Sequence, residues 1–160
     1  MSGMADAESK RLDMTSRESE ARWRGSLKEG SGRLRLGSGT FDGAYSFPSR
    51  FENGAGTNPE ELIAAAHAGC FSMALTAILG EAGFTPTLIH TVAKAHLGFT
   101  EAGPTLTRID IETEGDVSGI DDAGFQQHAE AAKARCLVSR ALAGVAAITL
   151  KARLSEQTSA

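Results

Sequence analysis

The chain has 160 residues and a formal net charge of −4 at pH 7, which is length enough for one domain with its own hydrophobic core. Its sixteen Lys and Arg residues are scattered along the chain, so we expect no basic surface for nucleic acid. It has two cysteines and no apolar segment of the signal-peptide kind near Met1. These features argue against a structural disulfide framework and indicate a cytoplasmic protein.

Residues 1–20 are polar and charged without periodicity, and we expect a flexible arm there, ahead of a single domain over residues 21–160. Polar and apolar residues then alternate on both sides of the turn predicted at Glu29–Gly32, which indicates a β-hairpin. The expected packed face of this hairpin holds Trp23, Leu27, Leu34 and Leu36. A glycine-rich loop over residues 46–57 is expected next, and it carries Arg50.

A long helix is predicted to begin after Asn58, which can cap it, with Pro59 at the first helical position and Glu61 completing a capping box. Gly83 is expected to end it. The run from Leu62 to Leu79 is uncharged and approaches the length of a membrane span, but it is rich in small and polar residues. A buried helix, with no membrane, is therefore the expectation. Because this helix is apolar on all sides, we expect a partner subunit to cover part of it.

Two β-strands are predicted over residues 87–100 and 105–117, with a turn at Gly103–Pro104 between them. A helix over residues 121–136, a short helix over 137–142 and a last strand over 145–154 follow. This order does not alternate strand and helix as a doubly wound sheet does. The sequence therefore predicts an α+β fold, with sheets around a central apolar helix.

Cys70 lies in the middle of the long helix, where a thiol is usually inert filler. Three features favour a reactive thiol instead. Cys136 is predicted at a helix end beside Lys133 and Arg135, whose charges can stabilise a thiolate. A second cysteine suggests redox pairing. Arg50 comes shortly before the helix that carries Cys70.

The segments TNPEELIAAAHAGCFSMAL (residues 57–75) and KARCLVSRAL (residues 133–142) resemble the OsmC/Ohr family of organic hydroperoxide reductases, and RFENGAGTNPEEL with His67 is most like its OsmC branch. The likeness runs from about Ala21 to about Leu154. The resemblance implies an OsmC-like fold and an intertwined homodimer. It also implies an enzyme that reduces alkyl or fatty-acyl hydroperoxides in oxidative or osmotic stress defence, with no metal, haem or flavin cofactor.

Four residues take catalytic roles by this resemblance. Cys70 resembles the peroxidatic cysteine, which becomes a sulfenic acid, and Cys136 the resolving cysteine, which condenses with it to a disulfide. Arg50 resembles the arginine that activates the thiol, and Glu60 the carboxylate that holds this arginine. A lipoyl or thioredoxin-type dithiol is the expected reductant. The chain departs from the family at Leu137, where the family commonly has Pro.

Each of these residues also has a simpler interpretation. Glu60 can be a partner of the helix dipole, Arg50 a loop charge, and His67 a helix histidine near the pocket. A metal or base role for His67 is disfavoured because no further ligand motif accompanies it. Two other functions share the fold: a module that binds an apolar ligand, and a redox sensor that passes oxidation to a partner.

Glu60 and Cys70 are ten residues apart on the predicted helix, which places them about 15 Å apart along its axis. They cannot meet on a straight helix. If Glu60 holds the arginine that activates Cys70, the site needs either a second copy of the chain or a kinked helix. A kink is disfavoured, because Gly69 is a weak cause of one. The sequence therefore favours a homodimer whose active site uses both chains.

Overall fold

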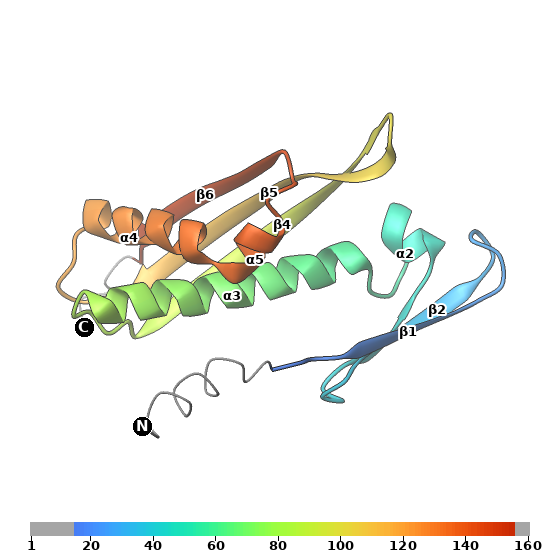
Figure 1. Cartoon of the computed structure of the whole chain (residues 1–160), viewed down its shortest axis with the longest axis horizontal. Coiled ribbons are helices and arrows are strands. Elements are labelled where there is room, and N and C mark those ends of the chain that lie inside the picture. The colour runs from blue at the N-terminus through green and yellow to red at the C-terminus, as the bar shows by residue number, and fades with distance from the viewer. Residues whose placement is uncertain (1–14, 156–160) are drawn as a thin grey trace, which may run out of the picture. The chain divides into compact units, whose positions relative to one another are not determined.

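The computed structural model describes residues 15–155, and it divides at Thr57–Asn58 into two compact units. Figure 1 shows the elements of both units in chain order. Most of the arm expected over residues 1–20 lies outside the described residues, and the first strand begins at Ser19, within that range. The single domain over residues 21–160 stays a prediction.

The first unit holds an antiparallel sheet of β1 (Ser19–Arg24), β2 (Ser31–Leu36) and β3 (Asp42–Tyr45), in that order. The predicted hairpin is confirmed, but its turn lies over residues 25–30, earlier than expected, because Trp23 pairs with Gly32 and Arg24 with Ser31. Leu27 therefore sits in the turn, where it is 65% exposed, and its placement on the packed face was wrong. The strand β3 was not predicted from the sequence.

The segment expected as a loop around Arg50 contains a short helix, α2 (Phe47–Phe51), so that expectation was wrong. Ser46 caps it: the Ser49 N–H donates to the Ser46 hydroxyl at 3.2 Å, and the Ser46 N–H donates to the Ser49 hydroxyl at 2.8 Å. This reciprocal capping box satisfies two backbone donors that a helix start leaves open. Arg50 is thus held on a turn of helix, with its guanidinium 5.1 Å from the centre of the Phe51 ring.

The second unit contains a sheet in the order β4 (Leu88–Thr100), β5 (Gly103–Asp116), β6 (Ala147–Leu154). β4 and β5 are antiparallel, joined by a tight turn over residues 101–102, and Gly103, the first residue of β5, has a φ of +95°. Pro104 already belongs to β5, so the turn lies two residues before the predicted one. β6 runs parallel to β5, and the crossover between them contains α4 (Asp122–Arg135) and α5 (Leu137–Ala141).

The long helix is α3 (Pro59–Glu81), with the predicted start and end. Asn58 caps it by accepting a hydrogen bond from the Glu61 N–H at 2.8 Å, and Gly83 follows its end with a φ of +88°. α3 is long and apolar enough to cross a bilayer by length and composition. In the structure it packs against β4, α4 and α5, as a core helix does.

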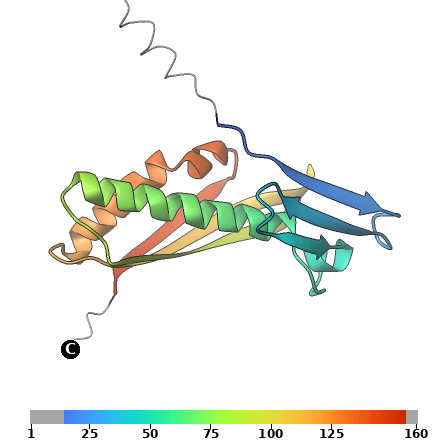
Figure 2. The same cartoon turned by 90° about the horizontal axis from the view of Figure 1, so that it is seen from below.

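The hydrophobic core of the second unit lies between its sheet and its helices. α3 and α4 lie on the same face of the sheet, as the turned view in Figure 2 shows. The fully buried members from α3, β5 and α4 are Phe71, Leu75, Leu79, Ile109, Ile111, Phe125, Ala129 and Ala132. The residues that alternate with Ile109 and Ile111 face the other side of the sheet. The predicted α+β fold is confirmed.

Candidate functional site

The two cysteines come together where α3 passes the junction of α4 and α5. Cys70 lies near the middle of α3, and Cys136 is the residue that ends α4 and caps α5. Both are free thiols, and Cys70 lies within hydrogen-bonding reach of Cys136. Cys136 is fully buried, whereas Cys70 is half-buried. A reagent from solvent therefore has access to Cys70 first.

The surroundings of Cys136 favour its thiolate. Burial by itself raises the pKa of the Cys136 thiol, and hydrogen bonds outweigh this effect, so the pKa lies below its ordinary value. The hydrogen bonds from the backbone N–H and the hydroxyl of Ser139 lower this pKa most, followed by those from Cys70 and the Val138 N–H. The Ser139 N–H donates to Cys136 Sγ at 3.5 Å.

The charged residues that were expected to help Cys136 are engaged elsewhere. Arg135 forms two bonds to the carboxylate of Glu81, at 2.9 and 3.2 Å. Lys133 donates to the carbonyl of Ile148 at 3.3 Å. The expectation that Lys133 and Arg135 stabilise the Cys136 thiolate was therefore wrong, because hydrogen bonds from α5 do this instead.

Ser139 is a residue of this site that the sequence analysis missed. It is the third residue of α5 and lies three positions after Cys136. A side chain that caps a helix accepts a hydrogen bond from the N–H at this third position. The spacing Cys-x-x-Ser at a helix start, which mimics the usual Ser-x-x-Glu capping pattern, was the available indication.

His67 completes the buried part of the site. It lies on α3 one turn before Cys70, is fully buried, and has its Nε2 atom 2.6 Å from the Ser139 hydroxyl oxygen. Burial lowers the pKa of His67, so the imidazole is neutral at physiological pH. Within residues 15–155 no group of three His, Cys, Asp or Glu side chains is placed to hold a metal ion.

The other two predicted residues are placed in different ways. Glu60 lies in the first turn of α3 and is only 9% exposed. Cys70 is ten residues further along the same uninterrupted helix, about 15 Å away along the axis. Arg50 belongs to the other unit, on α2. The structure thus brings together Cys70 and Cys136, and the roles of Arg50 and Glu60 stay predictions.

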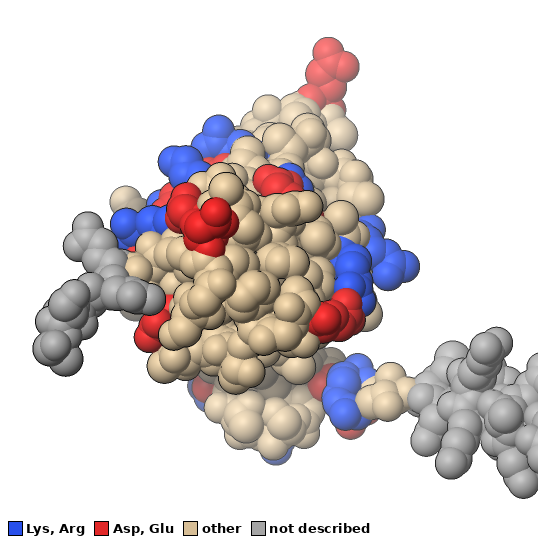
Figure 3. All heavy atoms as spheres, turned by 90° about the vertical axis from the view of Figure 1, so that its left-hand side faces the viewer, with Lys and Arg blue, Asp and Glu red and all other residues tan. Residues whose placement is uncertain are grey.

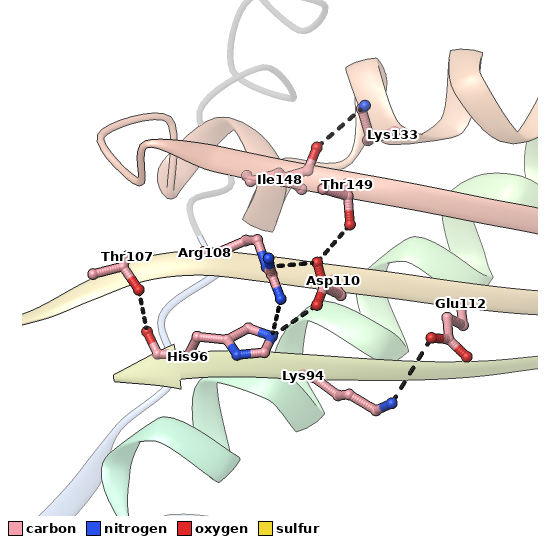
Figure 4. A network of polar contacts seen from close by, with 9 residues as sticks. All are labelled: Lys94, His96, Thr107, Arg108, Asp110, Glu112, Lys133, Ile148 and Thr149. Carbon is pink, nitrogen blue, oxygen red and sulfur yellow. Dashed lines mark hydrogen bonds and ion pairs between the residues drawn. The ribbon is translucent and has the colours of Figure 1, made fainter. Parts of the chain in front are cut away.

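A second polar cluster lies on the face of the sheet that points away from the helices, as Figure 4 shows. Asp110 accepts from Thr149 at 2.6 Å, from His96 at 2.7 Å and pairs with Arg108 at 3.0 Å. The Thr149 hydrogen bond, followed by those of His96 and the charge of Arg108, outweighs desolvation and lowers the pKa of Asp110. This cluster contains no thiol and joins all three strands, so it is a structural feature of the sheet.

A family model described as OsmC-like protein matches residues 52–151. Peroxiredoxin OsmC of Escherichia coli (strain K12) is 48% identical over 127 residues, which are 79% of this chain and 89% of that protein. The protein of the same name from Shigella flexneri shows the same identity and coverage. The chain belongs to the OsmC family. The predicted family and the predicted class of enzyme, a cysteine-based peroxidase, are confirmed by these relatives.

Solved structures of OsmC and Ohr proteins share the fold. The organic hydroperoxide resistance protein OsmC of Legionella pneumophila matches with a TM-score of 0.68 at 21% identity, over 89% of this chain and 100% of that one. The organic hydroperoxide resistance protein OhrB of Bacillus subtilis matches with a TM-score of 0.66 at 23% identity, over 86% and 98%. At these identities the likeness concerns the fold, and it confirms the OsmC-like architecture.

Proposed function

We propose that this OsmC-family chain is a thiol-dependent peroxidase that reduces organic hydroperoxides, alkyl or fatty-acyl, to alcohols in the cytoplasm, in defence against oxidative or osmotic stress. The observation that carries the proposal is the pairing of a half-buried Cys70 with a fully buried Cys136 from another helix. A peroxidatic thiol must meet its substrate, and a resolving thiol must be within reach of the oxidised sulfur.

In the first step the Cys70 thiolate attacks the terminal oxygen of the hydroperoxide. The O–O bond breaks, Cys70 becomes a sulfenic acid, and the alkoxide takes a proton to become the alcohol. In the second step Cys136 sulfur attacks Cys70 sulfur, and the hydroxyl group leaves as water with the thiol proton. A dithiol, of lipoyl or thioredoxin type, then reduces the disulfide and is itself oxidised.

Arg50 and Glu60 are proposed to support the first step. A guanidinium is permanently charged, can stabilise the thiolate and the departing alkoxide, and binds a carboxylate through two parallel hydrogen bonds. Because Glu60 and Cys70 are about 15 Å apart on one helix, we propose that Glu60 and Arg50 of one chain serve Cys70 of a second chain. No metal or organic cofactor is needed for this chemistry.

The homodimer also gives cover to the outer side of α3. Met73 is 77% exposed there and Leu88 of β4 is 60% exposed. Both line an open groove of about 470 Å³ between α3 and the start of β4. An exposed apolar groove beside a helix with few charges is the kind of surface that a subunit interface covers.

Nucleic acid is not an expected partner, because basic and acidic side chains are interspersed on the face in Figure 3.

The test is peroxide consumption by the purified chain with a small dithiol as reductant. Cumene hydroperoxide is compared with H2O2, and the Cys70→Ser chain is the control. We expect turnover that favours the organic peroxide and is lost in the control. Oxidation of Cys70 without turnover would instead indicate a redox sensor, and no oxidation of Cys70 would indicate a binding module of the same fold.

A further inference from the structure

The buried pair of His67 and Ser139 has no role in the peroxidase chemistry described above. It joins α3 to α5 across 72 positions of the chain, with 2.6 Å between Nε2 and the hydroxyl oxygen. His67 is fully buried, and its other ring nitrogen, Nδ1, has no hydrogen-bond partner among the described residues. An unpaired polar group in a core costs free energy of folding, so the hydrogen bond at Nε2 is what fixes the orientation of the ring.

Ser139 contacts Cys136 as well as His67. Its backbone N–H donates to Cys136 Sγ at 3.5 Å, which brings its hydroxyl close to the same thiol, and a hydrogen bond from this hydroxyl helps to lower the pKa of Cys136. A serine hydroxyl has one hydrogen and can donate it to one acceptor only. If it donated to His67, the Cys136 sulfur would lose that hydrogen bond. Where the Ser139 hydrogen points therefore depends on which ring nitrogen of His67 carries a hydrogen.

The burial of the ring favours one tautomer. Buried N–H groups without a partner are rarer in proteins than buried acceptors without one. The unpaired Nδ1 is therefore the bare nitrogen, and the hydrogen is on Nε2. In this state His67 donates to the Ser139 oxygen, and Ser139 is left to donate its own hydrogen to Cys136 Sγ.

We propose that His67 is a positioning residue for the resolving cysteine: through Ser139 it directs a hydroxyl hydrogen at Cys136 sulfur and makes Cys136 the ready nucleophile of the disulfide-forming step. This inference rests on the proposed function for its biological meaning. The step needs no further base. The S–S bond forms, the S–O bond of the Cys70 sulfenic acid breaks, and the hydroxyl group leaves with the Cys136 proton as one water. Ser139 stabilises the negative charge that develops on the attacking sulfur.

The charged side chains around this pair are directed to the surface. Arg135 pairs with Glu81, Lys133 pairs with Glu130, and Arg140 is exposed. Among the described residues, the hydrogen-bond partners of the Cys136 thiol are Ser139, Cys70 and the Val138 N–H. Apart from Cys70, the hydroxyl of Ser139 is therefore the side-chain hydrogen-bond partner of the Cys136 thiol within residues 15–155.

The resolving step can be followed without any peroxide. The aromatic disulfide 5,5′-dithiobis(2-nitrobenzoate) reacts with the accessible Cys70 and releases one coloured thiolate. Cys136 then attacks the mixed disulfide at Cys70 and releases the second. The wild-type chain should show two releases per chain and the Cys136→Ser chain one. The rate of the second release measures how readily Cys136 attacks.

Ser139→Ala should slow the second release and leave the first unchanged. The Ser139 hydroxyl stabilises the charged form of the Cys136 thiol, so its loss raises the pKa of that thiol. The lower thiolate fraction is partly offset by greater nucleophilicity, and we expect a net slowing of about threefold to tenfold at neutral pH. The pH profile of the second release should move to higher pH.

His67→Leu should have a similar effect, because Ser139 loses the donor that orients it. His67→Gln, whose side-chain amide can donate from a comparable position, and Ser139→Thr, which keeps the hydroxyl, should restore most of the rate. Thr113→Val is the matched control. Thr113 is also a buried hydroxyl, bonded to Thr91 at 3.0 Å, and its loss should leave both releases unchanged.

The inference fails if folded Ser139→Ala and His67→Leu chains keep the wild-type pH profile of the second release. It also fails if Thr113→Val shifts that profile equally. Failure of the peroxidase proposal gives a different result: the chain would not consume peroxide, while the effects of Ser139 and His67 on the second release would remain.

Discussion

Cys70 and Cys136 lie within hydrogen-bonding reach of one another although 66 positions of the chain separate them (136 minus 70). The contact exists because α3 packs against both α4 and α5, and Cys136 is at the junction of these two helices. Their unequal exposure is the basis of the roles proposed for them.

The first prediction concerns this division. Cys70→Ser should reduce peroxide turnover to background, because the accessible nucleophile is lost. Cys136→Ser should still permit one oxidation and should then accumulate sulfinic acid on Cys70, since no resolving thiol remains. Mass spectrometry after one equivalent of peroxide distinguishes these products. Sulfenic acid on Cys136 of an active Cys70→Ser chain would reverse the assignment.

The second prediction concerns Arg50. Arg50→Ala should lower the rate of reaction with organic peroxide about a hundredfold, which is the usual effect of removing one group that stabilises a developing oxyanion. Arg50→Lys should recover little of this rate, because an ammonium cannot form the planar, two-bond pair with Glu60. Single-turnover rates measure the effect, with Arg33→Ala, an exposed arginine of β2 paired with Asp42, as control. A wild-type rate in Arg50→Ala would remove Arg50 from the mechanism.

The third prediction tests whether the site uses two chains. Cys70→Ser and Glu60→Ala chains should each be inactive and should regain activity when mixed under conditions of subunit exchange. A heterodimer has one site that combines intact Cys70 with intact Glu60 and Arg50, so about half of its sites should work. Native mass spectrometry shows the exchange. Heterodimers without activity would mean that each chain builds its own site.

The fourth prediction concerns Leu137, where the family commonly has Pro. Leu137 is the first residue of α5 and is 68% exposed, and Cys136 before it has φ −57° and ψ 123°. Proline is favoured at the first helical position and requires an extended residue before it. Leu137→Pro should therefore stabilise the folded chain by about 0.4–1 kcal/mol, measured by denaturant unfolding. A loss of stability would show that α5 begins differently.

The fifth prediction concerns pH and Asp110. Its pKa is lowered in the folded chain, first by the Thr149 hydrogen bond. The ionised carboxylate therefore stabilises the fold above the ordinary Asp pKa of about 3.9, and this contribution is lost as the pH falls through the lower folded pKa. Asp110→Asn should lower the melting temperature at pH 7, and the difference from wild type should shrink below about pH 4.

Glu112→Gln is the control for Asp110. Glu112 pairs with Lys94 at 3.8 Å, and both side chains are about half exposed, so this pair should contribute little at any pH. An Asp110→Asn chain whose melting temperature equals that of wild type at pH 7 would contradict the stabilising role of the cluster.

Sequence patterns alone predict the long helix, its N-cap at Asn58, the Gly83 that follows its end, the second pair of strands and the helices around Cys136. These features follow from local rules of capping, periodicity and turn formation, which act over a few residues. The family and the two cysteines were also recognisable from motifs. The errors at Leu27 and around Arg50 were local, because glycine-rich segments are compatible with several turns and a short helix.

Which groups surround the thiols depends on how the helices pack, and local sequence patterns do not reveal it. Lys133 and Arg135 are neighbours of Cys136 in the sequence, yet they bind Ile148 and Glu81. His67 comes into contact with Ser139 from 72 positions away. The physical reason is that a side-chain contact between two helices depends on which faces pack together, and this is set by burial of the whole core rather than by spacing along the chain.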